Sequence, residues 1–304
     1  MSTVYEQVTD NIVSMLEKGD VPPWRKDWSG EAISIPHNGI TKREYQGINV
    51  WNLMITGWAK GYSSNQWGTY AQWKSIGGQV SKGERSSTAV FFKPLLRTDD
   101  SGEEYQVNIA RAFHVFNLDQ VIVDMPVEAP QSLSKDDIEL RGRAMEMANS
   151  LNIRLTEGLP AYNRLFDSIS MPKPETFTSM EAYYATMAHE CSHATGHESR
   201  LGRTFGKRFG DDEYAMEELT AELSAAYLCA KFGIPYELEQ HASYLSAWIK
   251  RLKSDAKAVF TVAAASQRAA DHISHEIGVL RLLNEQESEL AQLIGDGNEI
   301  NALS

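Results

Sequence analysis

A His-Glu-x-x-His pattern lies within a segment of the sequence that is predicted to form a helix. Residues 178–181 have the pattern of a capping box, and Gly196 is placed to end the helix. Residues four apart share one helix face, so the imidazoles of His189 and His193 can reach one metal ion. Glu190 can lie against a metal-bound water as a general base. The motif therefore predicts a metal site that needs a further ligand.

A motif of this length can also arise by chance, as a pair of histidines on a solvated helix face. The neighbouring residues are expected to be buried, which disfavours that alternative. They are Tyr184, Ala185, Met187 and Ala188.

The further ligand is expected from the next predicted helix, which carries several glutamates on an Ala-rich sequence. Glu218 and Glu222 lie one turn apart on a face that is expected to be buried, where carboxylates are paired or bind metal. We expect Glu218 to be the third ligand and Glu222 to orient a ligand histidine. Glu217 is expected to point towards solvent. The alternative is that both buried carboxylates pair with Arg200 or Arg203.

A metzincin site requires a third histidine at position 199, but that residue is Ser199, and His197 comes two residues early. A His/His/Glu set leaves the fourth position open for water, as catalytic zinc sites do. Acidified water with Glu190 as its base is typical of amide hydrolysis. We therefore expect Zn²⁺, or another divalent metal such as Mn²⁺, and zinc metallopeptidase chemistry. Candidates to stabilise the oxyanion are Tyr183, Tyr184, Tyr214 and His197.

Charge is distributed unevenly along the 304 residues, although the formal net charge is −12. Residues 22–97 carry ten basic and four acidic residues, a net charge of +6, and six of the seven tryptophans. Single-stranded nucleic acids are bound by aromatic faces that stack on bases and by cations that contact phosphates. The alternative for each tryptophan is burial in the core.

The residues predicted to bind single-stranded DNA combine flat rings, amides and cations within this basic segment. They are Arg43, Tyr45, Asn49, Trp67, Gln72, Trp73, Lys74, Lys82 and Lys93. The segment has no Gly-rich phosphate-binding loop.

Residues 126–134 read as a linker, so we predict two domains, 1–128 and 129–304. The predicted fold class is α+β. The first domain is expected to be a small α+β domain, and the second to be mainly helical. The helices predicted in the first domain span residues 3–18, 47–60 and 67–76, and its strands span residues 90–92 and 107–116. The helices predicted in the second domain span residues 179–194, 212–231, 237–255 and 256–294, with a break near Ser274.

Targeting features are lacking in the sequence. No apolar run approaches the roughly 20 residues that a membrane helix needs, and the first residues do not resemble a signal peptide. Two cysteines, Cys191 and Cys229, do not make a disulfide framework. We expect a cytoplasmic protein that does not bind membranes.

The combination of these motifs resembles the ArdC antirestriction proteins. The stretch from Tyr45 to Lys93 resembles their N-terminal single-stranded DNA-binding domain, which is shared with plasmid primases. The stretch from Tyr183 to Leu228 resembles their zincin-like metallopeptidase domain. That stretch holds the His-Glu-x-x-His motif, Arg200-Leu201-Gly202-Arg203, Phe209-Gly210, and Tyr214-Ala215-x-Glu217-Glu218-Leu219-x-Ala221-Glu222.

The resemblance implies a plasmid or mobile-element protein that protects incoming DNA from host restriction during conjugation. A gluzincin-type glutamate ligand follows by analogy, and a host protein is the implied peptidase substrate. One alternative is a non-proteolytic DNA-binding protein that acts by occlusion, with zinc as a structural brace. Another is a metal-dependent nuclease, which is disfavoured because His-Glu-x-x-His with a glutamate ligand favours amide hydrolysis.

Overall fold

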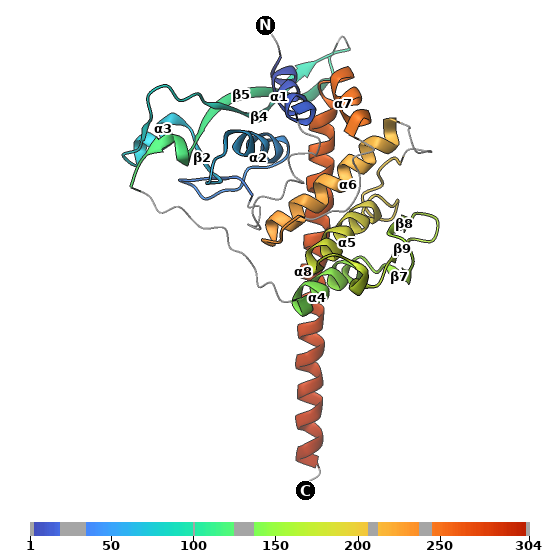
Figure 1. The fold of residues 1–304 in the computed structure, drawn as a ribbon. Coiled ribbons are helices and arrows are strands. Elements are labelled where there is room, and N and C mark those ends of the chain that lie inside the picture. Colours follow the sequence, from blue (N-terminus) through green and yellow to red (C-terminus); the bar gives the residue numbers. More distant parts are fainter. Residues whose placement is uncertain are drawn as a thin grey trace.

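A computed structural model describes the backbone of residues 3–18, 35–99, 101–124, 137–205, 212–236 and 245–301 (Figure 1). The side chains of Lys18, Asp212, Leu245 and residues 287–301 are not described. The predicted linker at 126–134 lies outside the described residues, and so do Trp24 and Trp28. The division into domains 1–128 and 129–304 stays a prediction.

The N-terminal half combines three helices with a sheet of the order β1-β2-β5-β4. Its helices are α1 (Val4–Lys18), α2 (Ile48–Lys60) and α3 (Tyr70–Ser75), and the strands of that sheet are β1 (His37–Asn38), β2 (Gln66–Gly68), β4 (Ser87–Thr98) and β5 (Glu104–Asn117). Strands β3 (Gln79–Val80) and β6 (Val121–Ile122) form a separate antiparallel pair. A 3-10 turn, η2 (Leu118–Gln120), follows β5. Strands β4 and β5 contain the strands predicted at 90–92 and 107–116 but are longer, because they form an antiparallel ribbon that extends beyond the rest of the sheet.

The C-terminal half is mainly helical, as predicted, and its helices pack around one long helix (Figure 1). They are α4 (Asp137–Ser150), α5 (Met180–Ala194), α6 (Asp212–Lys231), α7 (Leu245–Ser254) and α8 (Ala258–Asn301). The sequence did not reveal the small sheet β7-β9-β8, made of β7 (Arg154–Glu157), β8 (Ala161–Asn163) and β9 (Ser168–Met171), or the 3-10 turn η3 (Pro174–Thr176). Together with the mixed N-terminal half, this arrangement confirms the α+β class.

Helix α8 has no break at Ser274, contrary to prediction. The Ser274 hydroxyl donates a hydrogen bond of 2.8 Å to the carbonyl of Ala270, one turn earlier. A serine that bonds in this way is accommodated inside a helix, so the polar residue does not end it.

One hydrophobic core runs through both halves. Val8, Ile12 and Leu16 of α1 belong to the same buried cluster as Trp248 of α7 and Ile273 of α8. Helix α8 contacts α2 on one side and α5 and α6 on the other. The same helix therefore supports the β-rich N-terminal half and the helices that carry the His-Glu-x-x-His motif. Cys191 and Cys229 are both buried as free thiols.

Candidate metal centre and aromatic groove

Helix α5 carries the His-Glu-x-x-His motif through the protein interior. Its N-cap is Ser179, one residue later than predicted, and the Ser179 hydroxyl accepts a hydrogen bond of 3.0 Å from the Ala182 amide. Every residue from Ala182 to Ala194 is buried, which excludes a histidine pair on a solvated face. Gly196 follows the helix where a Cβ atom would lie 2.7 Å from the Phe205 ring. Glycine at this position therefore lets the chain after α5 fold back closely.

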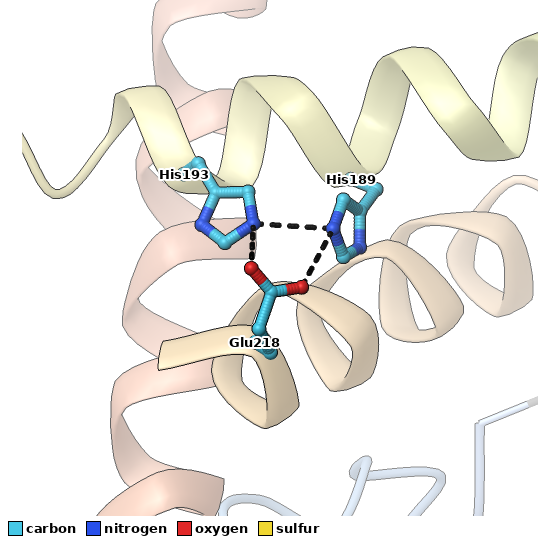
Figure 2. Close-up of side chains that lie close together, drawn as sticks. All are labelled: His189, His193 and Glu218. Carbon is cyan, nitrogen blue, oxygen red and sulfur yellow. Dashed lines mark hydrogen bonds and ion pairs between the residues drawn. The ribbon is translucent and has the colours of Figure 1, made fainter. Parts of the chain in front are cut away.

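The structure brings His189 and His193 of α5 together with Glu218 of α6 (Figure 2). The two Nε2 atoms are 3.1 Å apart, and they lie 3.6 Å and 3.5 Å from the Glu218 carboxylate oxygens. Ligand atoms that are about 2.0–2.1 Å from one tetrahedral ion are about 3.3–3.4 Å apart. The spacing and the nitrogen and oxygen donors therefore fit a divalent ion such as zinc or manganese.

Neighbouring charges shift the pKa of two of these side chains, His193 and Glu218. Burial lowers the pKa of His193, but the hydrogen bond to Glu217 and the nearby carboxylates outweigh it and raise the pKa to about 9. Burial raises the pKa of Glu218, but its interactions with His189 and His193 lower the pKa to about 2. The carboxylate charge is thus retained in a site that is almost closed to water. A divalent ion would supply positive charge at the same place.

Glu217 is buried beside the metal centre rather than solvated, so that prediction is wrong. Its Oε1 atom accepts a hydrogen bond of 3.2 Å from the Nδ1 atom of His193. The Arg203 guanidinium donates two bonds to the Glu217 carboxylate, at 2.7 Å and 3.0 Å. Arg203 also donates to the Ser192 carbonyl and to the Thr195 hydroxyl at the end of α5. Holding Nδ1 in this way directs Nε2 of His193 towards His189 and Glu218.

The alternative in which two arginines neutralise Glu218 and Glu222 does not match the contacts. Arg203 pairs with Glu217. Arg200 pairs with Asp167, which lies between β8 and β9. Sequence spacing alone cannot assign these partners, because Asp167 is brought close by the sheet that the sequence did not reveal.

The other predicted residues of this site are also buried. Glu190 is 6% exposed, next to His189 on α5, and Glu222 is fully buried one turn after Glu218 on α6. The Tyr214 hydroxyl forms a hydrogen bond with the Glu218 carboxylate. His197, by contrast, shares a hydrogen bond of 2.7 Å between its Nδ1 atom and the Ser199 hydroxyl. Tyr214 is thus the candidate with a described contact to the three clustered side chains.

An open cavity of about 1120 Å³ lies between the N-terminal half and α8. Its aromatic lining comes from Tyr45, Phe91, Phe92, Phe113 and Phe260, and its basic lining from Lys42, Arg43 and Arg268. We call this cavity the aromatic groove. The Gly47 amide donates a hydrogen bond to the side chain of Gln267 on α8. This bond connects α8 with the loop that precedes α2. The groove is therefore built by segments that are more than 200 residues apart in the sequence.

Only some of the predicted DNA-binding residues line this groove. Arg43, Tyr45 and Asn49 do, although the Asn49 side chain also bonds the Val90 backbone through both its oxygen and its nitrogen. Lys93 is exposed on β4, immediately after Phe92. Lys74 and Lys82 are exposed but lie outside the groove lining.

Trp67 and Trp73 cannot stack on bases in this structure, because both side chains are fully buried. Trp73 packs against Gly39 and Gly68, where added Cβ atoms would lie 2.6 Å and 2.9 Å from its indole, and its Nε1 atom donates to the Phe116 carbonyl. Gln72 completes the capping box with Thr69 and accepts a bond from Asn38. Burial of both rings contradicts the predictions for Trp67 and Trp73. Gln72 is half-buried, and its role in DNA binding stays a prediction.

The sequence did not identify the aromatic residues that the structure exposes instead. Phe91 and Phe92 are each 47% exposed. Their position next to Lys93 is the sequence feature that could have identified them as binding residues. No sequence feature near Arg268 identifies it as a groove residue, because its place at the groove depends on how α8 packs.

Within the described residues, no helix combines the length and the apolar character needed to cross a membrane.

Two histidines four apart on one buried helix, with a glutamate from the next helix, define a zincin-like metal centre. Residues 143–266 match the family of zincin-like metallopeptidases. Residues 2–116 match the N-terminal domain of the anti-restriction factor ArdC.

Full-length comparisons agree with both matches. The crystal structure of the antirestriction protein ArdC from plasmid R388 is 37% identical in its metal-free form, with a TM-score of 0.76, and covers 91% of this chain and 98% of the ArdC chain. Its Mn(II)-bound form is 36% identical, with a TM-score of 0.75 and the same coverage. The y4eC protein of Sinorhizobium fredii is 38% identical over 88% of this chain and 90% of its own length.

The DNA primase TraC of Escherichia coli is 33% identical over 88% of this chain, but the match spans only 20% of the primase. The chain belongs to the ArdC antirestriction family, and the resemblance inferred from the sequence motifs is confirmed.

Proposed function

We propose that this protein is an antirestriction protein of a plasmid or mobile element. It binds single-stranded DNA in the aromatic groove and holds a divalent metal between His189, His193 and Glu218 for metallopeptidase-type hydrolysis. The observation that carries the proposal is the buried His/His/Glu cluster with the buried Glu190 one residue after His189, in a chain that also builds a groove lined by five aromatic rings, three cations and two carboxylates, Glu44 and Asp271.

The metal half of the proposal rests on the chemistry of the three side chains. The related R388 protein has been crystallised with Mn(II). When bound, a divalent metal polarises a carbonyl group and acidifies water. Glu190, which follows His189 on α5 and is buried, would be the base for such a water, while Glu217 and Arg203 fix the His193 ring. Tyr214 restrains the Glu218 carboxylate.

The DNA half rests on the lining of the aromatic groove. Bases stack on aromatic rings without regard to sequence, and Lys and Arg contact phosphates. Phe91, Phe92 and Tyr45 supply rings, while Arg43 from the loop before α2 and Arg268 from α8 supply cations. The binding should therefore prefer single strands and weaken as salt rises.

The test of the metal half is the substitution Glu190→Gln, with Glu198→Gln as the matched control because Glu198 is exposed near the same helix end. Glu190→Gln should leave metal content and thermal stability unchanged and abolish protein cleavage. Protection of an unmodified plasmid during transfer into a restricting host should then be lost, and the host proteome should no longer show cleavage products. Undiminished protection by Glu190→Gln would contradict the proposal. It would favour the alternative in which the protein protects DNA by covering it and the metal has a structural role between α5 and α6.

The test of the DNA half is fluorescence anisotropy with a short oligothymidylate and a duplex of equal length. Tyr45→Ala should weaken single-strand binding about five- to 150-fold, the range expected when one stacked base loses its platform. Tyr70→Ala is the control, since Tyr70 is exposed on α3 outside the groove lining. Equal affinity for the duplex, or binding that does not change with salt, would contradict the proposal. Strand cleavage with added metal would instead indicate a nuclease.

A further inference from the structure

The distal part of strands β4 and β5 forms a two-stranded ribbon that extends beyond the rest of the sheet (Figure 1). Residues 93–99 and 101–112 do not line the aromatic groove. Opposite residues in an antiparallel pair lie on the same face, and successive residues alternate between faces. One face of the ribbon therefore carries four consecutive pairs. These are Phe91↔Arg111, Lys93↔Ile109, Leu95↔Val107 and Arg97↔Tyr105. We call these eight residues the ribbon face.

The ribbon face combines cations with exposed rings. Lys93, Arg97 and Arg111 are all exposed, and none of the eight residues is acidic. Within the part of the chain that the structure describes, these three cations form no ion pair. Phe91 and Tyr105 are 47% and 46% exposed. The other face of the same ribbon has no basic residue and includes Glu104.

The ribbon face is continuous with the aromatic groove. Phe91 belongs to both, and its ring centroid lies 6.0 Å from that of Phe113, which also lines the groove. Lys93 follows on the same face, two residues along β4. The path from Phe91 to Arg97 spans six residues, or about 20 Å of extended strand. A strand of nucleic acid leaving the groove beside Phe91 would therefore meet a ring and a cation in the first and last pairs of the face, with Lys93 and aliphatic side chains between them.

We propose that the ribbon face is a second binding surface for single-stranded DNA, which extends the strand path out of the aromatic groove. This inference rests on the proposed function, because the groove supplies the first part of the path. Charge complementarity favours this occupant: three exposed cations match a polymer with regularly spaced phosphates. The exposed rings favour unstacked bases over a duplex, whose bases already stack on one another.

The experiment compares two fluorescent oligothymidylates, of eight and 24 nucleotides, by anisotropy at several salt concentrations. The triple variant Lys93→Gln, Arg97→Gln and Arg111→Gln should bind the 24-mer about 100-fold more weakly at 0.1 M salt. It should also reduce the slope of log affinity against log salt by about 2, since each single-strand phosphate contact contributes about 0.7. Binding of the 8-mer should stay within about twofold, because the groove is unchanged.

The matched control removes three exposed cations from the C-terminal half, Arg154, Lys231 and Lys250, by the same substitution to Gln. This control changes the net charge equally and should leave both oligonucleotides bound as in the wild type. A second variant, Tyr105→Ala, tests the surface without altering charge and should weaken only the 24-mer, by about five- to 150-fold.

The outcomes separate this inference from the proposed function. Wild-type affinity and salt slope of the triple variant for the 24-mer would overturn the ribbon face while leaving the groove intact. A loss confined to duplex binding would also overturn it. Failure of the wild type to bind either oligonucleotide would overturn both proposals. A circular dichroism melt of each variant identifies any that fails to fold, and Tyr105→Ala then decides the question.

Discussion

The metal centre and the ribbon face both contain charged side chains with aromatic neighbours. The charged side chains are buried at the metal centre and exposed on the ribbon face. At the metal centre, His189, His193 and Glu218 are almost closed to water and contact one another. On the ribbon face, Lys93, Arg97 and Arg111 are exposed and form no ion pair with any residue that the structure describes. A buried charge must be satisfied within the fold or by a bound ion, whereas an exposed charge remains available to a ligand. The contrast distinguishes a preformed site from an open surface.

The aromatic residues of the N-terminal half show the same contrast at closer range. Trp67 on strand β2 and Trp73 on helix α3 are fully buried, while Phe91 and Phe92 are about half exposed at the groove. The larger rings therefore belong to the core, and the smaller ones are accessible at the surface. Ring type alone does not tell which residue binds.

The largest expected effect separates these two groups of rings. Trp67→Ala should lower the free energy of unfolding by about 3–5 kcal/mol, since it empties a fully buried site. Phe91→Ala should change it by less than about 0.5 kcal/mol, because the ring is half exposed, yet it should weaken DNA binding. Urea unfolding and anisotropy measure the two effects. The contrast fails if Phe91→Ala destabilises the protein as much as Trp67→Ala does.

The second effect concerns a charge that is paired inside the C-terminal half. Asp167 accepts two hydrogen bonds of 2.9 Å from Arg200 and one of 2.8 Å from the Tyr162 hydroxyl. Burial raises its pKa, but these bonds and the Arg200 charge lower the pKa overall. Asp167→Asn should cost about 1.5–3 kcal/mol at neutral pH. Asparagine also tolerates the φ of 44° at this position.

The pH dependence of that cost has a fixed sign. A carboxyl with a depressed pKa stabilises the fold above its unfolded pKa, and this contribution disappears as pH falls through the folded pKa. The difference in unfolding free energy between wild type and Asp167→Asn should be constant from pH 7 to about 5 and shrink below about pH 4. Lys93→Gln on the ribbon face is the control and should show no such trend. A difference that grows on acidification would contradict the assignment.

The third effect tests whether the metal centre depends on its buried support. Glu217→Gln keeps the shape of the side chain but removes the charge that Arg203 and His193 share. Affinity for Mn²⁺ or Zn²⁺, measured by titration calorimetry, should fall about ten- to 100-fold, as expected when a partner that orients a ligand is lost. Glu213→Gln is the control, because Glu213 is exposed on the same helix. Unchanged affinity would show that His193 needs no such support.

More of the metal centre than of the groove could be predicted from the sequence, because the spacing of its residues follows the periodicity of two helices. His189 and His193 are fixed by helical periodicity, and Glu218 by the face of the next helix, so local rules suffice. Glu217 was misjudged because the position of Arg203 depends on how the chain turns after Gly196. The groove requires α8 to meet a loop more than 200 residues earlier, and such packing leaves no periodic signal. Composition led to the prediction of Tyr45, which lines the groove, and of Trp67 and Trp73, which are buried in the core.

The smallest expected effect is that of a single cation on DNA binding. It tests whether a cation contributes because it lines the groove or only because it adds to the overall positive charge. Arg43 lines the groove, whereas Lys82 is exposed outside its lining. Arg43→Gln should reduce the salt slope of single-strand binding by about 0.7, equivalent to about fivefold in affinity at 0.1 M salt. Lys82→Gln carries the same charge change and should leave slope and affinity unchanged within about twofold. Equal losses of affinity and salt slope in both variants would mean that the whole positive N-terminal segment attracts DNA. The groove would then not be a specific binding site within that segment.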